Sequence, residues 1–411
     1  MEIYRAATVL PISGPPIRDG AVAVDDATIV AVGHVRHMPP GRVIDAGPLL
    51  MPGLVNAHTH LCYSAYADHY ANGKSFFEWI QDFAIRNATM TQQDWRASAR
   101  EGVSQSLRAG VTAVADVVTP PDALPELLDS GLSGSFYFEA CYIDTPRWKE
   151  ERDAFLAVVD GILSRPPGDG WTLGISPHTL YTLGTAVGQD LGRIARERGL
   201  RLHPHLAETV HEDAYVRAGE GAFSDVVDTA FELLDGGCGA SPAVEMDRWG
   251  LLGADSHVAH GVHLDVADRA LLRDRGTAVA LCPRSNDRLG AGEAPVAAYR
   301  AERHPVAVGT DSRASAPDLD VAAELPVLRD LAVKQGDAGD GLDEWLVRAA
   351  TQGGAVAMGR RDFGVLEPGT RANLAAFDVD AGTDPYAAMV DAAGGACVAT
   401  VLGGRAWFHD E

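Results

Sequence analysis

The chain has 411 residues, 46% hydrophobic and 22% charged, which is an ordinary balance for a globular protein with a large core. Its formal net charge of −23 argues against a nucleic-acid partner, because no basic stripe is present to neutralise phosphates. The five cysteines lie far apart without a CxxC pair, as is usual for reduced thiols. No apolar run reaches membrane-spanning length and no signal-peptide pattern opens the chain, so we expect a cytoplasmic protein that acts on a small molecule. The sequence also allows a homo-oligomer.

Both ends of the chain are expected to form short strands. Residues 1–51 contain alternating apolar stretches such as "AVAVDDATIVAVG", broken by Asp-Asp and Pro-Gly turns. Residues 364–411 repeat this pattern in "ANLAAFDVD" and "ACVATVLGGRAWF". We therefore predict a small β-sandwich domain formed by both termini.

Residues 52–363 show a different pattern, in which short apolar strands alternate with amphipathic helices. The strand beginning this series, "LLMPGLVNAHTH", is interrupted by Pro52 and Gly53. Eight strand candidates in this part of the chain favour a TIM (β/α)8 barrel over an open sheet, which makes the fold class α/β. The segment 232–247 resembles a loop insertion after the fifth strand. The clearest helices are expected at 91–109, 147–163, 187–198, 265–275 and 319–334.

In a TIM barrel the chemistry lies at the C-terminal ends of the strands. His58 and His60 end the first strand, and residues i and i+2 of a strand point to the same face. Read alone, they could be two polar residues at the start of a loop. Histidine, however, ends four of the eight strands, and three imidazoles with one carboxylate suit a hydrolytic zinc or iron centre. The polar residues at the strand ends are, in chain order, His58, His60, Asp116, Glu139, His178, His205, Glu208, His260, Arg284 and Asp311.

This set resembles the amidohydrolase superfamily, through "HTH", "HPHLAET", "VAHGVHL" and "GTDS". The C-terminal "LEPGTRANLAAFD" resembles that superfamily's β-sandwich, although Asn373 stands where an aspartate is usual. The resemblance implies one divalent metal ion, with zinc expected and ferrous iron as the alternative. The fourth strand ends in "SPHT", without the bridging lysine of two-metal members. The implied metal ligands are His58, His60, His205 and Asp311.

Glu208, three residues after His205, is similar to the general acid/base of the nucleoside, guanine and cytosine deaminase branch. Deamination of an aromatic ring needs a group that protonates the ring nitrogen and then the departing ammonia, and one carboxylate can do both. The resemblance implies that His260 and Asp311 orient and deprotonate the attacking water. The alternative for Glu208 is an acid in the first turn of a helix.

The resemblance also suggests a substrate. His178 in "SPHTLYT" is similar to the substrate-facing histidine of the S-adenosylhomocysteine and methylthioadenosine deaminases. Together with "FYFEACY" and "CPRSN", it is most similar to the aminodeoxyfutalosine deaminases of menaquinone biosynthesis. We therefore predict a hydrolytic deaminase of a nucleoside-like aminopurine, with 6-amino-6-deoxyfutalosine favoured. The alternatives are adenosine or S-adenosylhomocysteine, guanine-type or triazine-type hydrolysis, and a catalytically inactive scaffold.

Two arginines are candidates for binding the benzoate of that substrate. Arg284 in "CPRSN" and Arg86 at the end of "SFFEWIQDFAIR" are expected near the barrel mouth, where a guanidinium can pair with a carboxylate. Arg86 could instead stabilise a helix C-terminus, and Arg284 could pair with a loop acid such as Asp287. Asp116 and Glu139 are interpreted as polar side chains that fill the barrel mouth.

Overall fold

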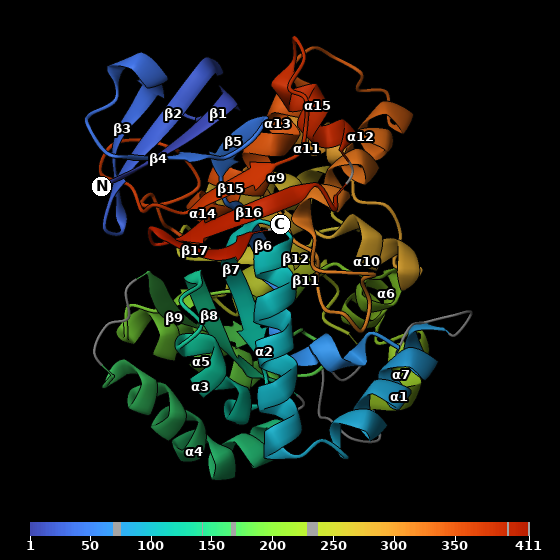
Figure 1. The fold of residues 1–411 in the computed structure, drawn as a ribbon. Coiled ribbons are helices and arrows are strands. Elements are labelled where there is room, and N and C mark those ends of the chain that lie inside the picture. Colours follow the sequence, from blue (N-terminus) through green and yellow to red (C-terminus); the bar gives the residue numbers. More distant parts are fainter. Residues whose placement is uncertain (69–74, 142, 166–169, 228–236, 393, 410–411) are drawn as a thin grey trace.

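The computed structural model describes residues 1–68, 75–141, 143–165, 170–227, 237–392 and 394–409. Its central element is a closed ring of parallel strands, of which β6 to β9, β11 and β12 are labelled in Figure 1. Strands β6 to β10 pair in one run and β11 to β14 in another, and isolated parallel bridges at Leu202–Ser256 and Thr59–Asp311 close the ring. The fifth position is split into β10 and β11 around His203 and Pro204. The TIM barrel prediction is therefore confirmed. The barrel strands are β6 Leu54–Thr59, β7 Val111–Val118, β8 Ser133–Ala140, β9 Trp171–Pro177, β10 Arg201–Leu202, β11 His205–Leu206, β12 His257–His260, β13 Ala278–Leu281 and β14 Val306–Val308.

Helices surround the barrel and cover its outer face (Figure 1). The five predicted helices are present, although the last begins with a 3-10 turn at Val321–Ala323. The segment 232–247 was predicted as a loop; 232–236 lie outside the described residues, and the remainder contains α8, whose start is capped by Ser241. No described helix is long and apolar enough to cross a membrane. The α-helices are α1 Phe76–Asn87, α2 Gln92–Arg108, α3 Leu124–Leu128, α4 Thr145–Leu163, α5 Thr185–Glu197, α6 Val210–Ala218, α7 Ala222–Val227, α8 Pro242–Arg248, α9 Val266–Arg275, α10 Pro283–Arg288, α11 Val296–Ala301, α12 Glu324–Lys334, α13 Leu342–Arg348, α14 Gly354–Ala357 and α15 Pro385–Asp391.

The two ends of the chain meet in a second sheet with the order β17-β16-β15-β5-β1-β2-β3, in which β4 also pairs with β1. The antiparallel pair β5–β15 joins the N-terminal strands to the C-terminal ones. The two-layer sandwich and the domain limits 1–51, 52–363 and 364–411 stay predictions. The strands of this terminal sheet are β1 Glu2–Val9, β2 Ile17–Asp25, β3 Thr28–His34, β4 Arg42–Asp45, β5 Leu49–Pro52, β15 Leu374–Phe377, β16 Cys397–Leu402 and β17 Arg405–His409.

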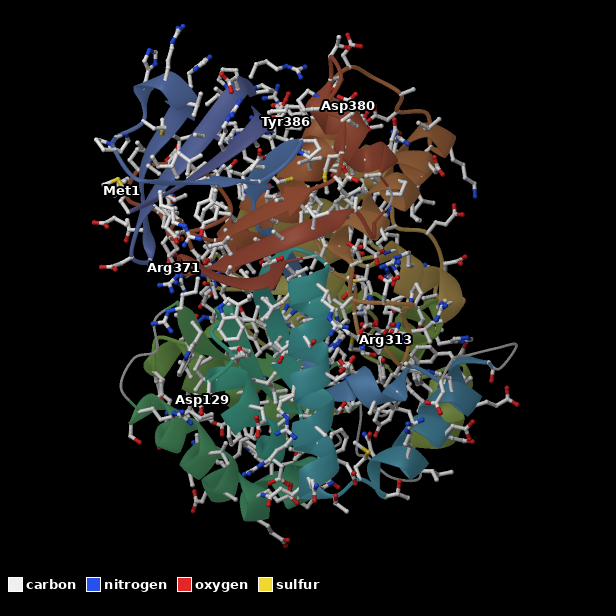
Figure 2. All side chains as sticks on the ribbon, viewed as in Figure 1. Met1, Asp129, Arg313, Arg371, Asp380 and Tyr386 are labelled. Atoms are coloured by element: carbon white, nitrogen blue, oxygen red, sulfur yellow. The ribbon has the colours of Figure 1, made fainter. Side chains whose placement is uncertain are left out.

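Side chains fill the boundary between the terminal sheet and the barrel, where Arg371 lies (Figure 2). The Asn373 amide donates a hydrogen bond to Ser133 Oγ at 2.8 Å, and its carbonyl accepts one from Gly403 N at 3.0 Å. Asn373 therefore links the terminal sheet directly to the barrel.

The interruption at Pro52 and Gly53 is the passage from the terminal sheet into the barrel. The stretch predicted as one strand is two, because β5 belongs to the terminal sheet and β6 to the barrel. A Cβ at Gly53 would lie 2.1 Å from Thr112 Oγ1, so only glycine fits this close crossing. The chain enters the barrel core at once and brings His58 and His60 to the end of β6.

Candidate active site

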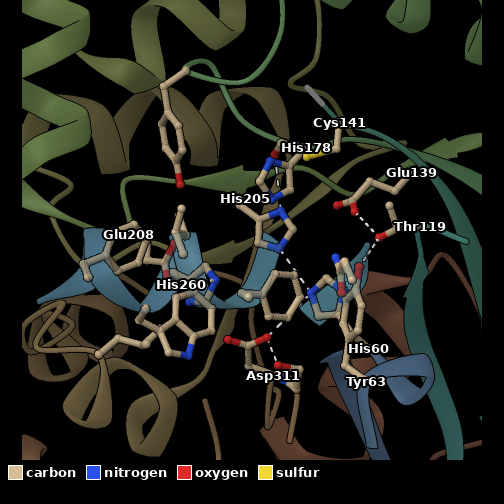
Figure 3. A pocket seen from close by; sticks show the side chains of 18 residues that line it. His60, Tyr63, Thr119, Glu139, Cys141, His178, His205, Glu208, His260 and Asp311 are labelled. Atoms are coloured by element: carbon tan, nitrogen blue, oxygen red, sulfur yellow. Dashed lines mark hydrogen bonds and ion pairs between the residues drawn. The ribbon is translucent and has the colours of Figure 1, made fainter. Parts of the chain in front are cut away.

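A cavity lies at the C-terminal ends of the barrel strands (Figure 3). The polar part of its wall consists of residues that end or follow barrel strands, and the apolar part comes mainly from α1. The predicted residues that line it are His60, His178, His205, Glu208, His260 and Asp311, and α1 adds Phe76, Trp79, Ile80, Phe83 and Asn87. The apolar stripe of α1 therefore faces the cavity.

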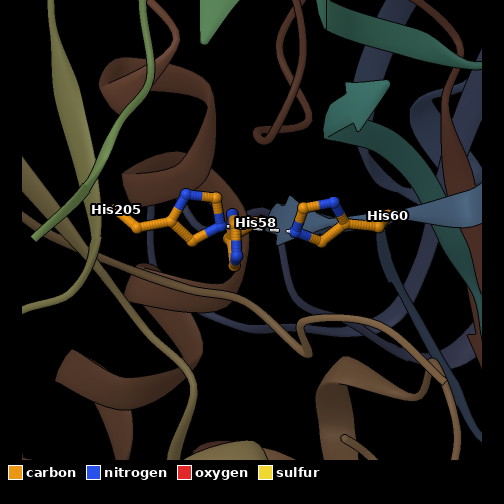
Figure 4. Close-up of side chains that lie close together, drawn as sticks. All are labelled: His58, His60 and His205. Atoms are coloured by element: carbon orange, nitrogen blue, oxygen red, sulfur yellow. Dashed lines mark hydrogen bonds between the residues drawn. The ribbon is translucent and has the colours of Figure 1, made fainter. Parts of the chain in front are cut away.

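The imidazoles of His58, His60 and His205 converge at the inner end of this cavity (Figure 4). Their candidate ligand atoms lie within 4.8 Å of one another, and Nε2 of His60 is 3.4 Å from Nε2 of His205. Asp311 Oδ1 is 3.6 Å from Nε2 of both His58 and His60. The buried His58 Nε2 has no hydrogen-bond partner among the described residues. An unpartnered buried nitrogen surrounded by other ligand atoms fits a metal ion, so these residues suit a divalent metal.

The electrostatics of the cluster also suit a metal. Burial lowers the pKa of His58 to about 3 and that of His60 to about 4, and it lowers the pKa of His205 well below its usual value. The imidazoles are therefore neutral near pH 7, which is the form that binds metals. Burial alone would raise the pKa of Asp311, but the electrostatic effect of the surrounding histidines, with His58 Nε2 at 3.6 Å, holds that pKa below the usual range.

The Asp311 carboxylate is held by residues that the sequence analysis did not single out. Ser285 Oγ and Ser315 Oγ donate to its Oδ2 at 2.6 and 2.8 Å, and the backbone N–H of Ser312 donates to Oδ1 at 2.7 Å. Asp311 also has a left-handed backbone, with φ of 62°, as does His260, with φ of 72°. Such conformations are costly for residues other than glycine and are concentrated at functional sites, where the surrounding structure enforces them.

Glu208 points into the cavity beside His260. Its Oε1 lies 3.8 Å from His260 Nε2, and burial raises the pKa of Glu208. Glu208 precedes Thr209, the N-cap of α6, so it is not an acid of that helix's first turn. Glu212 does lie in the first turn, and its Oε2 accepts a hydrogen bond from the Glu208 backbone N–H at 3.0 Å. Glu212 was not identified from the sequence, although it fixes the backbone that carries Glu208.

Two further residues of the cavity come from β8 and β9. His178 directly follows β9, and its Nδ1 pairs with Thr182 Oγ1 at 2.8 Å. Glu139, interpreted above as a polar filler, lines the cavity and accepts a 2.6 Å hydrogen bond from Thr119 Oγ1. Burial raises the pKa of Glu139 to about 8. Asp116 is fully buried, outside the cavity wall, and accepts a hydrogen bond from the Leu61 backbone N–H at 2.7 Å.

The structure does not bring the two predicted arginines to the cavity wall. Arg284 Nε donates to Glu324 Oε1 at 2.6 Å, and its terminal nitrogens bond to Asp318. Its partners are therefore the buried Glu324 at the start of α12 and Asp318, and not Asp287. Arg86 donates to Asp68 Oδ1 at 2.6 Å and to a backbone carbonyl, with its guanidinium 4.5 Å from the Tyr66 ring centre. The described residues that line the cavity include no arginine or lysine.

The amidohydrolase family model matches residues 49–405 of the chain. This chain belongs to the amidohydrolase family. It is 35% identical to the 5-methylthioadenosine/S-adenosylhomocysteine deaminase of Halobacterium salinarum over 378 residues, covering 89% of this chain and 81% of that protein. It is 33% identical to the aminodeoxyfutalosine deaminase of Deinococcus radiodurans, covering 83% and 82% of the two chains. The predicted enzyme class is thereby confirmed: this amidohydrolase acts on carbon–nitrogen bonds other than peptide bonds, in cyclic amidines.

Solved structures agree with this assignment. An adenosine deaminase from Xanthomonas campestris with bound zinc superimposes with a TM-score of 0.82 at 25% identity, covering 100% of this chain and 93% of that one. The aminofutalosine deaminase of Helicobacter pylori, in complex with methylthio-coformycin, gives a TM-score of 0.84 at 18% identity and covers 99% and 100% of the two chains, which shows a shared fold. The zinc of the first neighbour and the histidine–aspartate cluster of this amidohydrolase together support a divalent metal cofactor.

Proposed function

We propose that this amidohydrolase hydrolyses the exocyclic amino group of a 6-aminopurine in a nucleoside-like substrate and releases ammonia. The observation that carries the proposal is the position of Glu208, whose buried carboxyl group faces the same cavity as the cluster of His58, His60, His205 and Asp311. The relatives named as deaminases of methylthioadenosine, S-adenosylhomocysteine and aminodeoxyfutalosine support a purine nucleoside.

The bound metal ion would supply Lewis acidity, which lowers the pKa of water toward neutrality. Glu208 has a raised pKa because it is buried, so its acid form is available to protonate the ring nitrogen as water adds to the amino-bearing carbon. His260 Nδ1 lies 3.0 Å from Asn286 Oδ1, an acceptor, so Nδ1 carries the proton and Nε2 is free to accept one from the attacking water. The Glu208 carboxylate then takes the remaining proton of the added hydroxyl group and passes it to the amine, which leaves as ammonia. His260 Nε2, 3.8 Å from Glu208 Oε1, returns the proton of the attacking water to Glu208.

The apolar wall indicates what the rest of the substrate is like. Phe76, Trp79, Ile80 and Phe83 of α1 line the cavity together with the polar residues at the strand ends. This surface suits an apolar or aromatic substituent at the 5′ position of the nucleoside. Aminodeoxyfutalosine, favoured by the sequence motifs, would place its benzoate ring there. Methylthioadenosine is the second candidate, because the described wall offers no cation for a carboxylate.

The direct test is ammonia release by the zinc-loaded enzyme from aminodeoxyfutalosine, methylthioadenosine, S-adenosylhomocysteine, adenosine and guanine. We expect kcat/KM to be highest for a nucleoside with an apolar or aromatic 5′ substituent and to fall by about tenfold or more for adenosine, since roughly 1.4 kcal/mol of apolar contact is lost. Hydrolysis of guanine or a triazine without turnover of any aminopurine nucleoside would contradict the proposal. A zinc-loaded protein without any turnover would favour the inactive scaffold.

A further inference from the structure

Two buried histidines lie beneath the metal-ligand cluster. His203 sits between β10 and β11, and His257 begins β12. Both are fully buried, and their rings stack with centres 3.8 Å apart and planes 15° apart. Neither lines the cavity, so neither can contact substrate. His203 nevertheless touches a metal-ligand side chain, because its Nε2 lies 2.9 Å from Nδ1 of His58.

The direction of this hydrogen bond follows from the atoms at its far end. His203 Nδ1 lies 2.9 Å from the backbone carbonyl oxygen of His257, which can only accept a proton. His203 Nδ1 therefore carries a hydrogen and donates it to that carbonyl. In a neutral ring this leaves His203 Nε2 as an acceptor, so His58 Nδ1 must donate to it. The His58 proton is then on Nδ1, and Nε2 presents its lone pair to the cluster.

The opposite arrangement is unfavourable. A hydrogen on His203 Nε2 would leave its Nδ1 unprotonated. That nitrogen and the His257 carbonyl oxygen, both acceptors, would then face each other at 2.9 Å in a fully buried site. His205 is oriented differently, since its Nδ1 pairs with the backbone carbonyl of His178 at 3.2 Å. The Nδ1 atom of His58 is thus held by the His203 side chain and not by a backbone carbonyl, so a substitution at His203 removes this hydrogen bond.

We propose that His203 is a positioning residue for the metal centre. Two consecutive hydrogen bonds form a relay: His203 donates to the His257 carbonyl, and His58 donates to His203. This relay fixes the Nδ1–H tautomer and the ring orientation of His58, so that Nε2 is ready to bind metal. The inference rests on the assignment of His58 as a ligand and is independent of the substrate. Metal affinity should therefore depend on a residue that touches neither metal nor substrate, as is known for hydrogen-bond partners of metal-binding histidines in general.

The test compares three variants by zinc affinity, measured by competition with a chelator. His203→Gln keeps an acceptor for His58 and a donor for the His257 carbonyl, whereas His203→Leu keeps only bulk. His257→Leu is the control: it removes the stacked ring and its 3.1 Å hydrogen bond to the Ala57 carbonyl, while leaving the His257 backbone carbonyl that His203 bonds in place. We expect His203→Leu to weaken zinc binding by about 10- to 100-fold, and both His203→Gln and His257→Leu by less than about threefold.

Unchanged zinc affinity in His203→Leu, or an equal loss in His257→Leu, would overturn the proposal. A second measurement is made on the wild-type protein and uses His58→Asn only to assign the signals. In the metal-free enzyme with 15N-labelled histidine, the imidazole resonances lost in His58→Asn belong to His58. We expect them to show a protonated Nδ1 and an unprotonated Nε2 at pH 7. A proton on His58 Nε2 would equally overturn the relay, whether or not the variants fold.

Discussion

The inner end and the outer wall of the catalytic cavity are built in different ways. At the inner end His58, His60, His205 and Asp311 stand on strand ends, are less than a tenth exposed, and are held by hydrogen bonds from elements far apart in the sequence. The outer wall comes largely from α1, whose start is fixed by a capping box between Ser75 and Glu78 and of which only Phe76 is buried.

This difference suggests that the inner end governs the chemical step and that the outer wall governs substrate specificity. In the proposed function the strand-end cluster provides the metal ligands and the proton-transfer groups, so changes there should affect metal content and turnover. The α1 wall provides apolar surface without proton-transfer groups, so changes there should affect substrate affinity and leave the chemical step intact. The following variants test whether the two regions are as independent as their construction suggests.

The largest effect is expected for His58→Ala at the inner end. Removing one of the clustered imidazoles should release most of the bound metal and lower kcat by at least about 10³-fold, because the activated water is lost. Metal analysis and ammonia release on the same preparation provide the measurement. His34→Ala, in the terminal sheet, is the control and should retain both the bound metal and the ammonia release. Full metal occupancy in His58→Ala would refute the ligand assignment.

Arg284→Met should affect stability and not specificity. It leaves the buried carboxyl group of Glu324 without its cation, which costs about 3 kcal/mol or more in free energy of unfolding. Urea denaturation measures this loss. The ratio of kcat/KM for aminodeoxyfutalosine to that for adenosine should stay constant. A changed ratio in a variant of normal stability would return Arg284 to the role of benzoate contact.

Glu212→Gln tests the support beneath Glu208 through its pH dependence. Burial raises the pKa of Glu212 to about 8, so the folded protein holds a proton there that the unfolded chain loses at lower pH. The wild type should therefore lose stability relative to Glu212→Gln as pH rises from about 4.5 to 8, by up to roughly 1.4 kcal/mol per pH unit. Unfolding free energies at pH 5 and pH 8.5 check this, and a difference independent of pH would contradict it.

The smallest effect is expected at the outer wall. Ile80→Ala removes apolar surface from the cavity and should raise KM for substrates with an apolar 5′ substituent by about three- to tenfold, with kcat and adenosine turnover nearly unchanged. Ile85→Ala, on the exposed face of the same helix, is the matched control. A comparable loss in kcat for Ile80→Ala would mean that α1 also positions the reacting groups.

The sequence predicted the inner end better than the outer wall for a physical reason. His58, His60 and His205 project directly from strand ends, so the strand period and the barrel geometry are enough to bring them together. The partner of Arg284 is Glu324, 40 positions later, and a pairing at that separation is set by how α10 and α12 pack. No local pattern shows it. Glu139 was expected at the barrel mouth, where it lies, but its hydrogen bond with Thr119 depends on tertiary packing and is not visible in the sequence.

Glu208→Gln tests the central claim most directly, with metal content and ammonia release measured on the same samples as the wild type. The substitution keeps the size and hydrogen bonding of the side chain but cannot carry a proton. The account predicts full metal occupancy and a loss in kcat of at least about 10²-fold on the best aminopurine nucleoside. Near-normal turnover with full metal would contradict it, because another group would then carry the proton and the deaminase assignment of this cavity would lose its basis.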